Sequence, residues 1–291
     1  MSKSLLQPKR MILGIAALLL IIYLVACSCL FFLQSRYLFF PSPEVTETPK
    51  TYGLKYEEIN LPVAEKTSEA GSLNGWWIPA VKPDAPVILY FHGNGVNIGA
   101  NAEQAHRLRE LGFSVFLFDY RGYGKSTGPF PSEQRLYEDA ERAWSYVTKT
   151  RQVAPKKLLI YGHSLGGAIA IETASHHPEV GGLIVESSFT SILEMTRRVR
   201  WAPFFPMDLL LTQRFDSFSK VPGLKIPVLF IHGQADRTIP YQMSETNFSV
   251  APQPKRLLLI PNGDHDNDAI MGGDLYLNGF KSFTDKVLKD S

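Results

Sequence analysis

The feature that most constrains the fold is the pentapeptide Gly162–Gly166, which reads G-H-S-L-G. It follows the apolar run Lys157–Tyr161, which has the length and composition of a buried β-strand, and it leads into the small residues Gly167 and Ala168. A G-x-S-x-G pattern between a strand and a helix predicts a sharp turn, the nucleophile elbow, whose serine has a strained backbone. Glycines flank the serine because Cβ atoms there would collide with the neighbouring strand and helix. The hydroxyl of Ser164 is therefore predicted to lie at the carboxyl end of a central strand.

A serine hydroxyl needs a base that takes its proton and an acid that orients the base. Two later apolar runs are followed by suitable residues. Asp236 lies in the loop after Pro227–Ile231, and His265 lies just beyond Arg256–Ile260. Because successive parallel strands bring their carboxyl ends to one edge of a sheet, we expect Ser164, Asp236 and His265 to form a catalytic triad.

The negative charge that develops on the substrate oxygen requires two backbone N–H donors. One donor is predicted to be the amide of Leu165, directly after the nucleophile. The other is expected in the turn after the strand Val87–Phe91, where Gly93 and Gly95 allow the backbone to direct its N–H groups inward. We assign this second donor to Asn94.

Three nearby polar residues have other interpretations. Glu186 ends the predicted strand 182–185 and is an alternative triad acid, but Asp236 follows a later strand and fits the usual arrangement better. Otherwise Glu186 would support the loop that follows it. His92 is predicted to support the turn of the second oxyanion donor, and His163 is predicted to be a packing residue that points away from the nucleophile.

No cofactor or metal is expected. Gly122–Ser126 is reminiscent of a phosphate-binding loop, but that motif needs a glycine where Asp119 stands. The alternating aspartates of Asp264–Asp268 lack the glycine and the glutamate of an EF-hand calcium loop, since Ala269 and Leu275 occupy those positions. The net charge of +2 is too small to indicate binding to nucleic acid.

With these motifs in place, the sequence resembles the α/β-hydrolase family. It is most similar to the membrane-anchored serine hydrolases that include protein depalmitoylating thioesterases and lysophospholipases. The segments that carry this resemblance are Tyr37–Pro43, Phe91–Gly95, Asp119–Ser126, Gly162–Gly167 and Glu186–Ser191. The resemblance covers nearly everything after residue 35. It implies the fold and the catalytic residues but not the substrate, because members of the family hydrolyse different compounds.

The N-terminal region contains a 23-residue run without charge, Met11–Leu33. As a helix it would reach about 35 Å, which is enough to cross a bilayer and longer than the apolar region of a cleaved signal peptide. We therefore predict a retained single-pass anchor. The alternative is a lipoprotein signal, because Leu24–Cys27 resembles a lipobox that would leave Cys27 as a lipidated N-terminus.

The charges around this run predict its orientation. Lys3, Lys9 and Arg10 precede it, whereas only Arg36 follows closely. The positive-inside rule then places the N-terminus in the cytoplasm and the catalytic domain in the periplasm or a lumen.

The alternation of apolar runs and helical patterns after residue 55 predicts one α/β domain with a mostly parallel central sheet flanked by helices. We divide the chain into an anchor at 1–35, a juxtamembrane linker at 36–55 and a hydrolase domain at 56–291, with a short cap insertion at about 187–225. The sequence gives no indication of an oligomeric state. The predicted helices are Asn101–Leu111, Ser132–Lys149, Leu165–Ser175 and Leu277–Lys289.

The cap segment is rich in large apolar residues, some of which are expected to line an acyl pocket near Tyr37, Phe39 and Phe40. These cap residues are Trp201, Phe204, Phe205, Met207, Leu209, Leu210, Leu211, Phe215 and Phe218. We thus expect a membrane-anchored serine hydrolase that cleaves carboxylic ester or thioester bonds of small-molecule or lipid acyl substrates through an acyl-enzyme.

Two other functions stay open. A serine peptidase of the aminopeptidase type uses the same triad but needs polar groups that hold a free amine. The candidates in the cap are Glu194, Asp208 and Asp216. A non-catalytic binding module of the same fold would usually lack a member of the triad, and all three members have plausible positions here.

Overall fold

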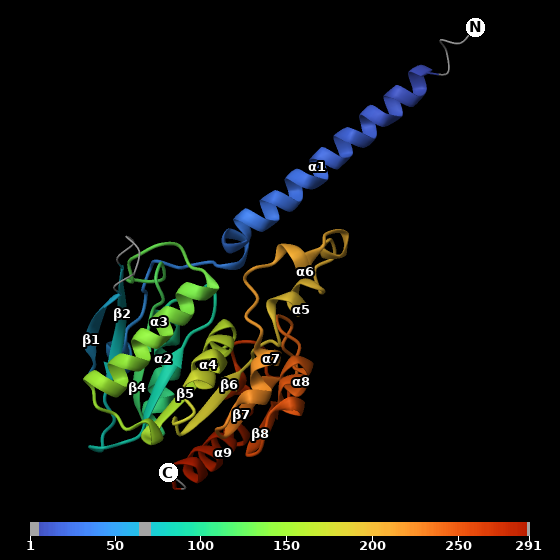
Figure 1. The fold of residues 1–291 in the computed structure, drawn as a ribbon. Coiled ribbons are helices and arrows are strands. Elements are labelled where there is room, and N and C mark those ends of the chain that lie inside the picture. Colours follow the sequence, from blue (N-terminus) through green and yellow to red (C-terminus); the bar gives the residue numbers. More distant parts are fainter. Residues whose placement is uncertain (1–5, 64–70, 290–291) are drawn as a thin grey trace.

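The structure is a computed structural model that describes residues 6–63 and 71–289. Its centre is an eight-stranded sheet with the order β1-β2-β4-β3-β5-β6-β7-β8 (Figure 1). The pairs β1–β2 and β2–β4 are antiparallel, and all the other neighbours are parallel. The strands are β1 (Glu57–Val63), β2 (Gly71–Ile78), β3 (Val87–Phe91), β4 (Ser114–Phe118), β5 (Leu158–His163), β6 (Gly182–Glu186), β7 (Val228–Gly233) and β8 (Lys255–Ile260).

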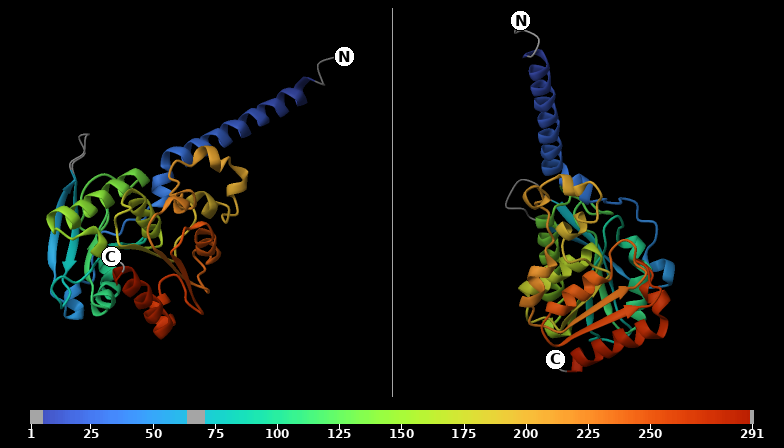
Figure 2. Two further views of the ribbon diagram at one scale, coloured as in Figure 1. Left: turned by 60° about the horizontal axis from the view of Figure 1, so that its bottom comes forward. Right: turned by 90° about the vertical axis from the view of Figure 1, so that its right-hand side faces the viewer.

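Helices cover both faces of this sheet (Figure 2). Alternate residues of the central strands point to opposite faces, so Val87, Leu89 and Phe91 of β3 join one core while Ile88 and Tyr90 join the other. The first core is closed by α3 (Glu133–Ser145) and α4 (Leu165–His176), and the second by α2 (Ala102–Glu110) and α9 (Asp268–Lys289). Helix α8 (Gln242–Val250) packs against the first core. The predicted α/β-hydrolase fold class is confirmed.

Three of the four predicted helices coincide with α2, α3 and α4 to within a few residues, and a π-helical turn continues α3 to Thr150. The fourth was predicted too short. Helix α9 begins at Asp268 rather than Leu277, and its backbone is interrupted at Gly273, where φ is 46°. A left-handed residue inside a helix breaks the hydrogen-bond ladder, so the sequence pattern is regular only after this point.

The N-terminal helix α1 (Leu6–Leu38) projects away from the sheet (Figure 1). It contains the predicted run Met11–Leu33 and continues without a break through Cys27. Within the described part of the chain, it is the one helix long and apolar enough to span a membrane. Of the charges used to predict orientation, Lys3 lies outside the described residues.

Between β6 and β7 the chain forms the cap, which holds the short helices α5 (Ile192–Thr196), α6 (Met207–Leu210) and α7 (Ser217–Lys220). Helix α6 contacts α1, and α5 in turn contacts α6. The left view of Figure 2 shows the cap next to the lower part of α1. Phe39, just after α1, is buried against Phe215 of the cap, with ring centroids 6.0 Å apart. The cap and the start of the linker therefore pack together above the carboxyl ends of the strands.

Candidate active site

The predicted elbow is present at the junction of β5 and α4. Ser164 has φ 55° and ψ −121°, a conformation that non-glycine residues adopt only where the surroundings enforce it. The flanking glycines leave no room for side chains. A Cβ at Gly162 would lie 2.2 Å from the carbonyl oxygen of Gly166, and one at Gly166 would lie 2.1 Å from that of Phe91. Close packing of β3, β5 and α4 thus forces the serine hydroxyl out at the strand end.

The structure brings together the three residues predicted to form the triad. The Nε2 atom of His265 lies 3.0 Å from Oγ of Ser164, and its Nδ1 atom lies 2.7 Å from Oδ2 of Asp236. Because an ionised carboxylate only accepts hydrogen bonds, Nδ1 carries the proton and Nε2 is left to accept from the serine hydroxyl. This arrangement is the one a serine nucleophile needs.

Asp236 is held by four donors. Its Oδ1 accepts from the amides of Thr238 at 2.7 Å and Ile239 at 2.9 Å, while its Oδ2 accepts from His265 and, at 3.2 Å, from Nε2 of His232. Burial by itself would raise the pKa of Asp236, but the hydrogen bonds from the two histidines and the backbone outweigh burial and hold that pKa well below its ordinary value. Asp236 is therefore ionised in the folded protein near neutral pH.

The charge on Asp236 acts in turn on His265. Burial lowers the pKa of His265, but the hydrogen bond and the negative charge of Asp236 more than compensate, so the pKa lies above its ordinary value. The carboxylate therefore stabilises the imidazolium that forms when the histidine accepts a proton.

His232 was missed by the sequence analysis. It is fully buried at the end of β7, and its Nδ1 atom lies 2.7 Å from the hydroxyl of Ser244. A histidine at the end of an otherwise apolar strand, four residues before the acid, is the signal that could have identified it. Its contacts fix the loop that carries Asp236.

Both residues predicted to donate to the oxyanion line the same cavity as Ser164. The Leu165 amide is the first of α4 and has no acceptor within its helix. The Asn94 side chain accepts from the hydroxyl of Tyr123 at 2.8 Å and from the amide of Phe40 at 3.1 Å, and it donates to the carbonyl of Leu38 at 2.6 Å. The Asn94 turn is therefore fixed by the segment that follows α1.

The alternative acid does not reach the histidine. Glu186 is buried and accepts hydrogen bonds from the hydroxyls of Tyr161 at 2.7 Å and Tyr276 at 2.8 Å. Both tyrosines belong to the core beneath α2 and α9. Within the described residues, Asp236 is the carboxylate hydrogen-bonded to the ring of His265.

The other two histidines near the site have supporting positions. His92 is fully buried, its Nδ1 atom lies 2.8 Å from the carbonyl oxygen of Gly93, and burial lowers its pKa to about 4, so it is neutral. His163 packs against His265, with ring centroids 5.0 Å apart, and its Nε2 atom lies 2.8 Å from the carbonyl oxygen of His265. It therefore supports the loop that carries His265.

One group of described residues could bring three metal ligands together, namely His163, His265 and Asp266, whose ligand atoms lie within 4.8 Å of one another. However, the two ring nitrogens of His265 are already engaged by Asp236 and Ser164. A metal on this histidine would displace the serine. The arrangement fits a proton relay better than a metal centre.

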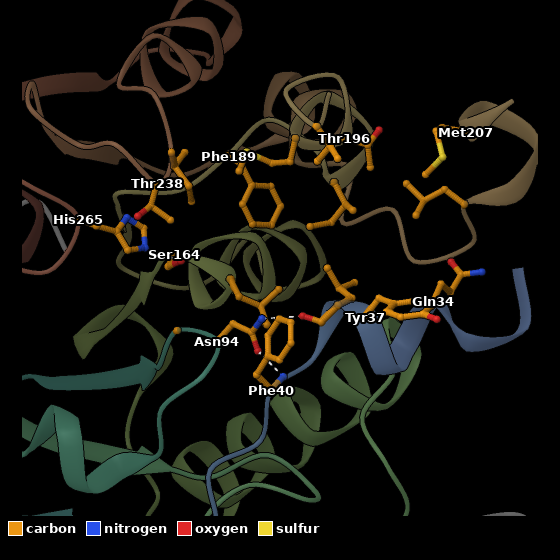
Figure 3. A pocket seen from close by; sticks show the side chains of 18 of the residues that line it. Gln34, Tyr37, Phe40, Asn94, Ser164, Phe189, Thr196, Met207, Thr238 and His265 are labelled. Atoms are coloured by element: carbon orange, nitrogen blue, oxygen red, sulfur yellow. Dashed lines mark hydrogen bonds between the residues drawn. The ribbon is translucent and has the colours of Figure 1, made fainter. Parts of the chain in front are cut away.

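A cavity of about 550 Å³ runs from Ser164 and His265 to the space between the cap and α1 (Figure 3). Its lining is mainly apolar. The cap contributes Phe189, Ile192, Met195, Trp201, Met207 and Leu210, among others. The end of α1 and the next residues contribute Leu30, Gln34, Tyr37, Leu38 and Phe40.

Some residues of the cap and the linker that were expected in or near the pocket lie elsewhere. Phe204, Leu209 and Phe218 are exposed on the surface, while Phe215 and Phe39 belong to the core. None of the three carboxylates considered for a peptidase lines the cavity. Glu194 pairs with Arg197, Asp208 is exposed, and Asp216 caps α7.

Comparisons with known proteins identify the family and the fold. Residues 82–217 match the family described as "Serine aminopeptidase, S33". The chain is 32% identical over 267 residues to protein Rv2307c of Mycobacterium tuberculosis, covering 90% of this chain and 92% of the relative. It is 33% identical over 243 residues to protein bem46 of Schizosaccharomyces pombe, covering 79% and 77%. Among solved structures, the esterase Pf2001 of Pyrococcus furiosus superposes with a TM-score of 0.66 at 19% identity, covering 86% of this chain and 98% of that one.

Proposed function

The chain belongs to the α/β-hydrolase family, and from this premise we propose that it is a membrane-anchored serine hydrolase that cleaves ester or thioester bonds of acyl-chain substrates. The observation that carries the proposal is the relay from Asp236 through His265 to Ser164 at one end of an apolar cavity. A complete relay of this kind supports catalysis rather than a non-catalytic binding module.

In the proposed mechanism, Oγ of Ser164 attacks the acyl carbonyl while Nε2 of His265 takes the hydroxyl proton. The amides of Asn94 and Leu165 donate to the oxyanion of the tetrahedral intermediate, and Asp236 stabilises the imidazolium. The intermediate collapses to an acyl-serine as His265 returns the proton to the leaving alcohol or thiol. Water, deprotonated by His265, then attacks the acyl-serine. Collapse of the second intermediate releases the carboxylic acid and restores the Ser164 hydroxyl.

The lining of the cavity favours an acyl chain over a peptide. An aminopeptidase, the activity named in the description of the matching family, needs a group that holds a free amine. Within the described residues, the one carboxylate that lines the cavity belongs to Asp266, and its side chain is 85% exposed. Large apolar side chains instead provide a favourable environment for methylene groups, each worth about 0.8 kcal/mol when buried.

Helix α1 supports the membrane anchor. Its apolar stretch continues past Cys27 to Leu33, which suits a retained span better than a lipoprotein signal. Lys9 and Arg10 at its start favour a cytoplasmic N-terminus, with the catalytic domain in the periplasm or a lumen.

The proposal is tested by labelling the full chain in detergent with a fluorophosphonate and locating the label by mass spectrometry. We expect the label on Ser164, together with turnover of p-nitrophenyl esters that becomes more efficient from acetyl to longer acyl chains. Turnover of aminoacyl-arylamides without ester hydrolysis would assign the peptidase function instead. A folded chain that takes up no label would indicate a binding module.

We further expect kcat/KM for a short soluble ester to fall on the acidic side with a midpoint above pH 6.5, the ordinary pKa of histidine. Only neutral His265 can accept the serine proton, and its pKa is raised by Asp236, so activity is lost as the pH drops through that raised value. The measurement is a series of initial rates from pH 5 to 9. A midpoint at or below 6.5 would mean that Asp236 does not raise the pKa of His265.

A further inference from the structure

One face of the second half of α1 is covered by the domain. Partly buried residues recur every three to four positions along it, whereas residues 9–25 are all exposed. This spacing corresponds to one side of a helix. The covered residues include Ala26, Cys27, Leu30, Gln34 and Leu38.

Hydrogen bonds hold this face to the domain at the C-terminal end of α1. Oε1 of Gln34 accepts from the cap amides of Thr212 at 2.8 Å and Gln213 at 3.0 Å, and its Nε2 donates to the carbonyl of Leu210 at 3.3 Å. One turn further on, Leu38 accepts from the side chain of Asn94. The end of α1 is thus joined to the cap on one side and to the oxyanion turn on the other.

The contact with the cap continues far up the helix. Tyr23 stacks on Phe205 of the cap, with ring centroids 5.6 Å apart and the planes inclined by 4°. A perpendicular span needs about 20 residues, so a span that starts at Met11 ends near Leu30. At a rise of ~1.5 Å per residue, Tyr23 and the cap residue stacked on it would then lie about 10 Å inside the hydrocarbon region.

The tip of the cap is apolar enough for that environment. Its exposed side chains include Trp201 at 48%, Phe204 at 76% and Leu209 at 78% exposed. Arg197, Arg198 and Arg200 are exposed on the adjacent stretch of the cap, where they could meet lipid headgroups. An exposed apolar patch bordered by basic residues is typical of a surface that enters a membrane.

We propose that the tip of the cap is inserted in the same leaflet as the second half of α1, and that the cavity between them takes an acyl chain directly from that leaflet. This inference rests on the proposed function. The carbonyl of such a chain would lie at Ser164, and the chain would extend toward Gln34 and Met207, which lie at the far end of the cavity (Figure 3). Leu30, which lies one helical turn closer to the membrane than Gln34 and also lines the cavity, limits the length of the acyl chain.

Insertion of the cap is tested with the full chain in phosphatidylcholine vesicles whose acyl chains carry bromine. The other three tryptophans, Trp76, Trp77 and Trp144, are buried in the domain, so bromine should quench mainly Trp201. We expect quenching in the wild type that is largely lost in Trp201→Phe. Equal quenching in the two proteins would overturn the insertion of the cap.

The contribution of α1 to the lining of the acyl cavity is tested with Leu30→Trp in the same vesicles. The ratio of kcat/KM for palmitoyl over butyryl esters should fall by at least about tenfold, because the larger side chain fills the distal end of the cavity. Leu24→Trp is the matched control, since Leu24 is exposed and does not line the cavity. It should change the ratio by less than about twofold. Equal ratios in the two variants would contradict the inference.

The molecule that supplies the acyl chain is identified by comparing a palmitoyl lysophospholipid with an S-palmitoyl peptide in these vesicles. Turnover of either supports the inference, and the faster substrate identifies the carrier. If the wild type hydrolyses a butyryl ester but neither carrier, uptake from the leaflet fails while the proposed function stands. If it hydrolyses none of the three, the proposed function itself fails.

Discussion

Ser164→Ala is expected to lower kcat for a short acyl ester by about 10⁶-fold while the protein remains folded. Alanine keeps the Cβ atom that is already accommodated at φ 55°, so the elbow between β5 and α4 is not strained further. What is lost is the oxygen that lies 3.0 Å from Nε2 of His265. The oxyanion donors and the cavity remain, so a residual rate of about 10³-fold over water should persist.

The measurement compares initial rates and thermal unfolding of the wild type, Ser164→Ala and Ser249→Ala. Ser249 is exposed, and its hydroxyl donates to the carbonyl of Thr246 within its own helix. The same substitution there should leave both the rate and the stability close to those of the wild type. If Ser164→Ala retains more than about one hundredth of the activity, another nucleophile carries the reaction, because substrate binding and the oxyanion donors alone should sustain only about one millionth of the wild-type rate.

The proximity of the three residues of the proposed triad could be predicted because each follows an apolar run that is a parallel strand. Parallel strands end at one edge of a sheet, so their following loops meet there whatever the details of the intervening helices. Ser164, Asp236 and His265 are far apart in the sequence but adjacent in the fold for this reason. No comparable rule predicted the positions of β1 and β2. Apolar and polar residues alternate only weakly along these two strands, which lie at the antiparallel edge of the sheet.

The walls of the cavity could be predicted only in part. That the cap contributes apolar residues follows from its composition, but which of them point inward depends on its path over the sheet. The contribution of α1 depends on hydrogen bonds such as that between Gln34 and Thr212, which are 178 residues apart in the sequence. A pattern in the sequence describes a helix and its faces, whereas the partner of each face is set by packing.

Asp236→Asn is expected to lower kcat by about 10⁴-fold with little change in the fold. The surroundings decide how the new amide is oriented. The amides of Thr238 and Ile239 both donate to Oδ1, so the carbonyl oxygen of the asparagine will occupy that position. Its NH₂ group then faces Nδ1 of His265. That nitrogen can only accept, so the proton moves to Nε2, where it prevents the ring from taking the proton of Ser164.

Glu186→Gln is the matched comparison, since it makes the same chemical change at the alternative acid. The glutamine oxygen can still accept from Tyr161 and Tyr276, so we expect a stability cost of about 1–2 kcal/mol and activity within about tenfold of the wild type. Initial rates and thermal unfolding of the two variants decide between the acids. If Asp236→Asn keeps its activity while Glu186→Gln is folded but inactive, Glu186 is the acid. The His265 ring would then have to turn away from the contact it makes with Asp236. Loss of activity in Asp236→Asn alone would instead tie catalysis to the tautomer that this contact imposes.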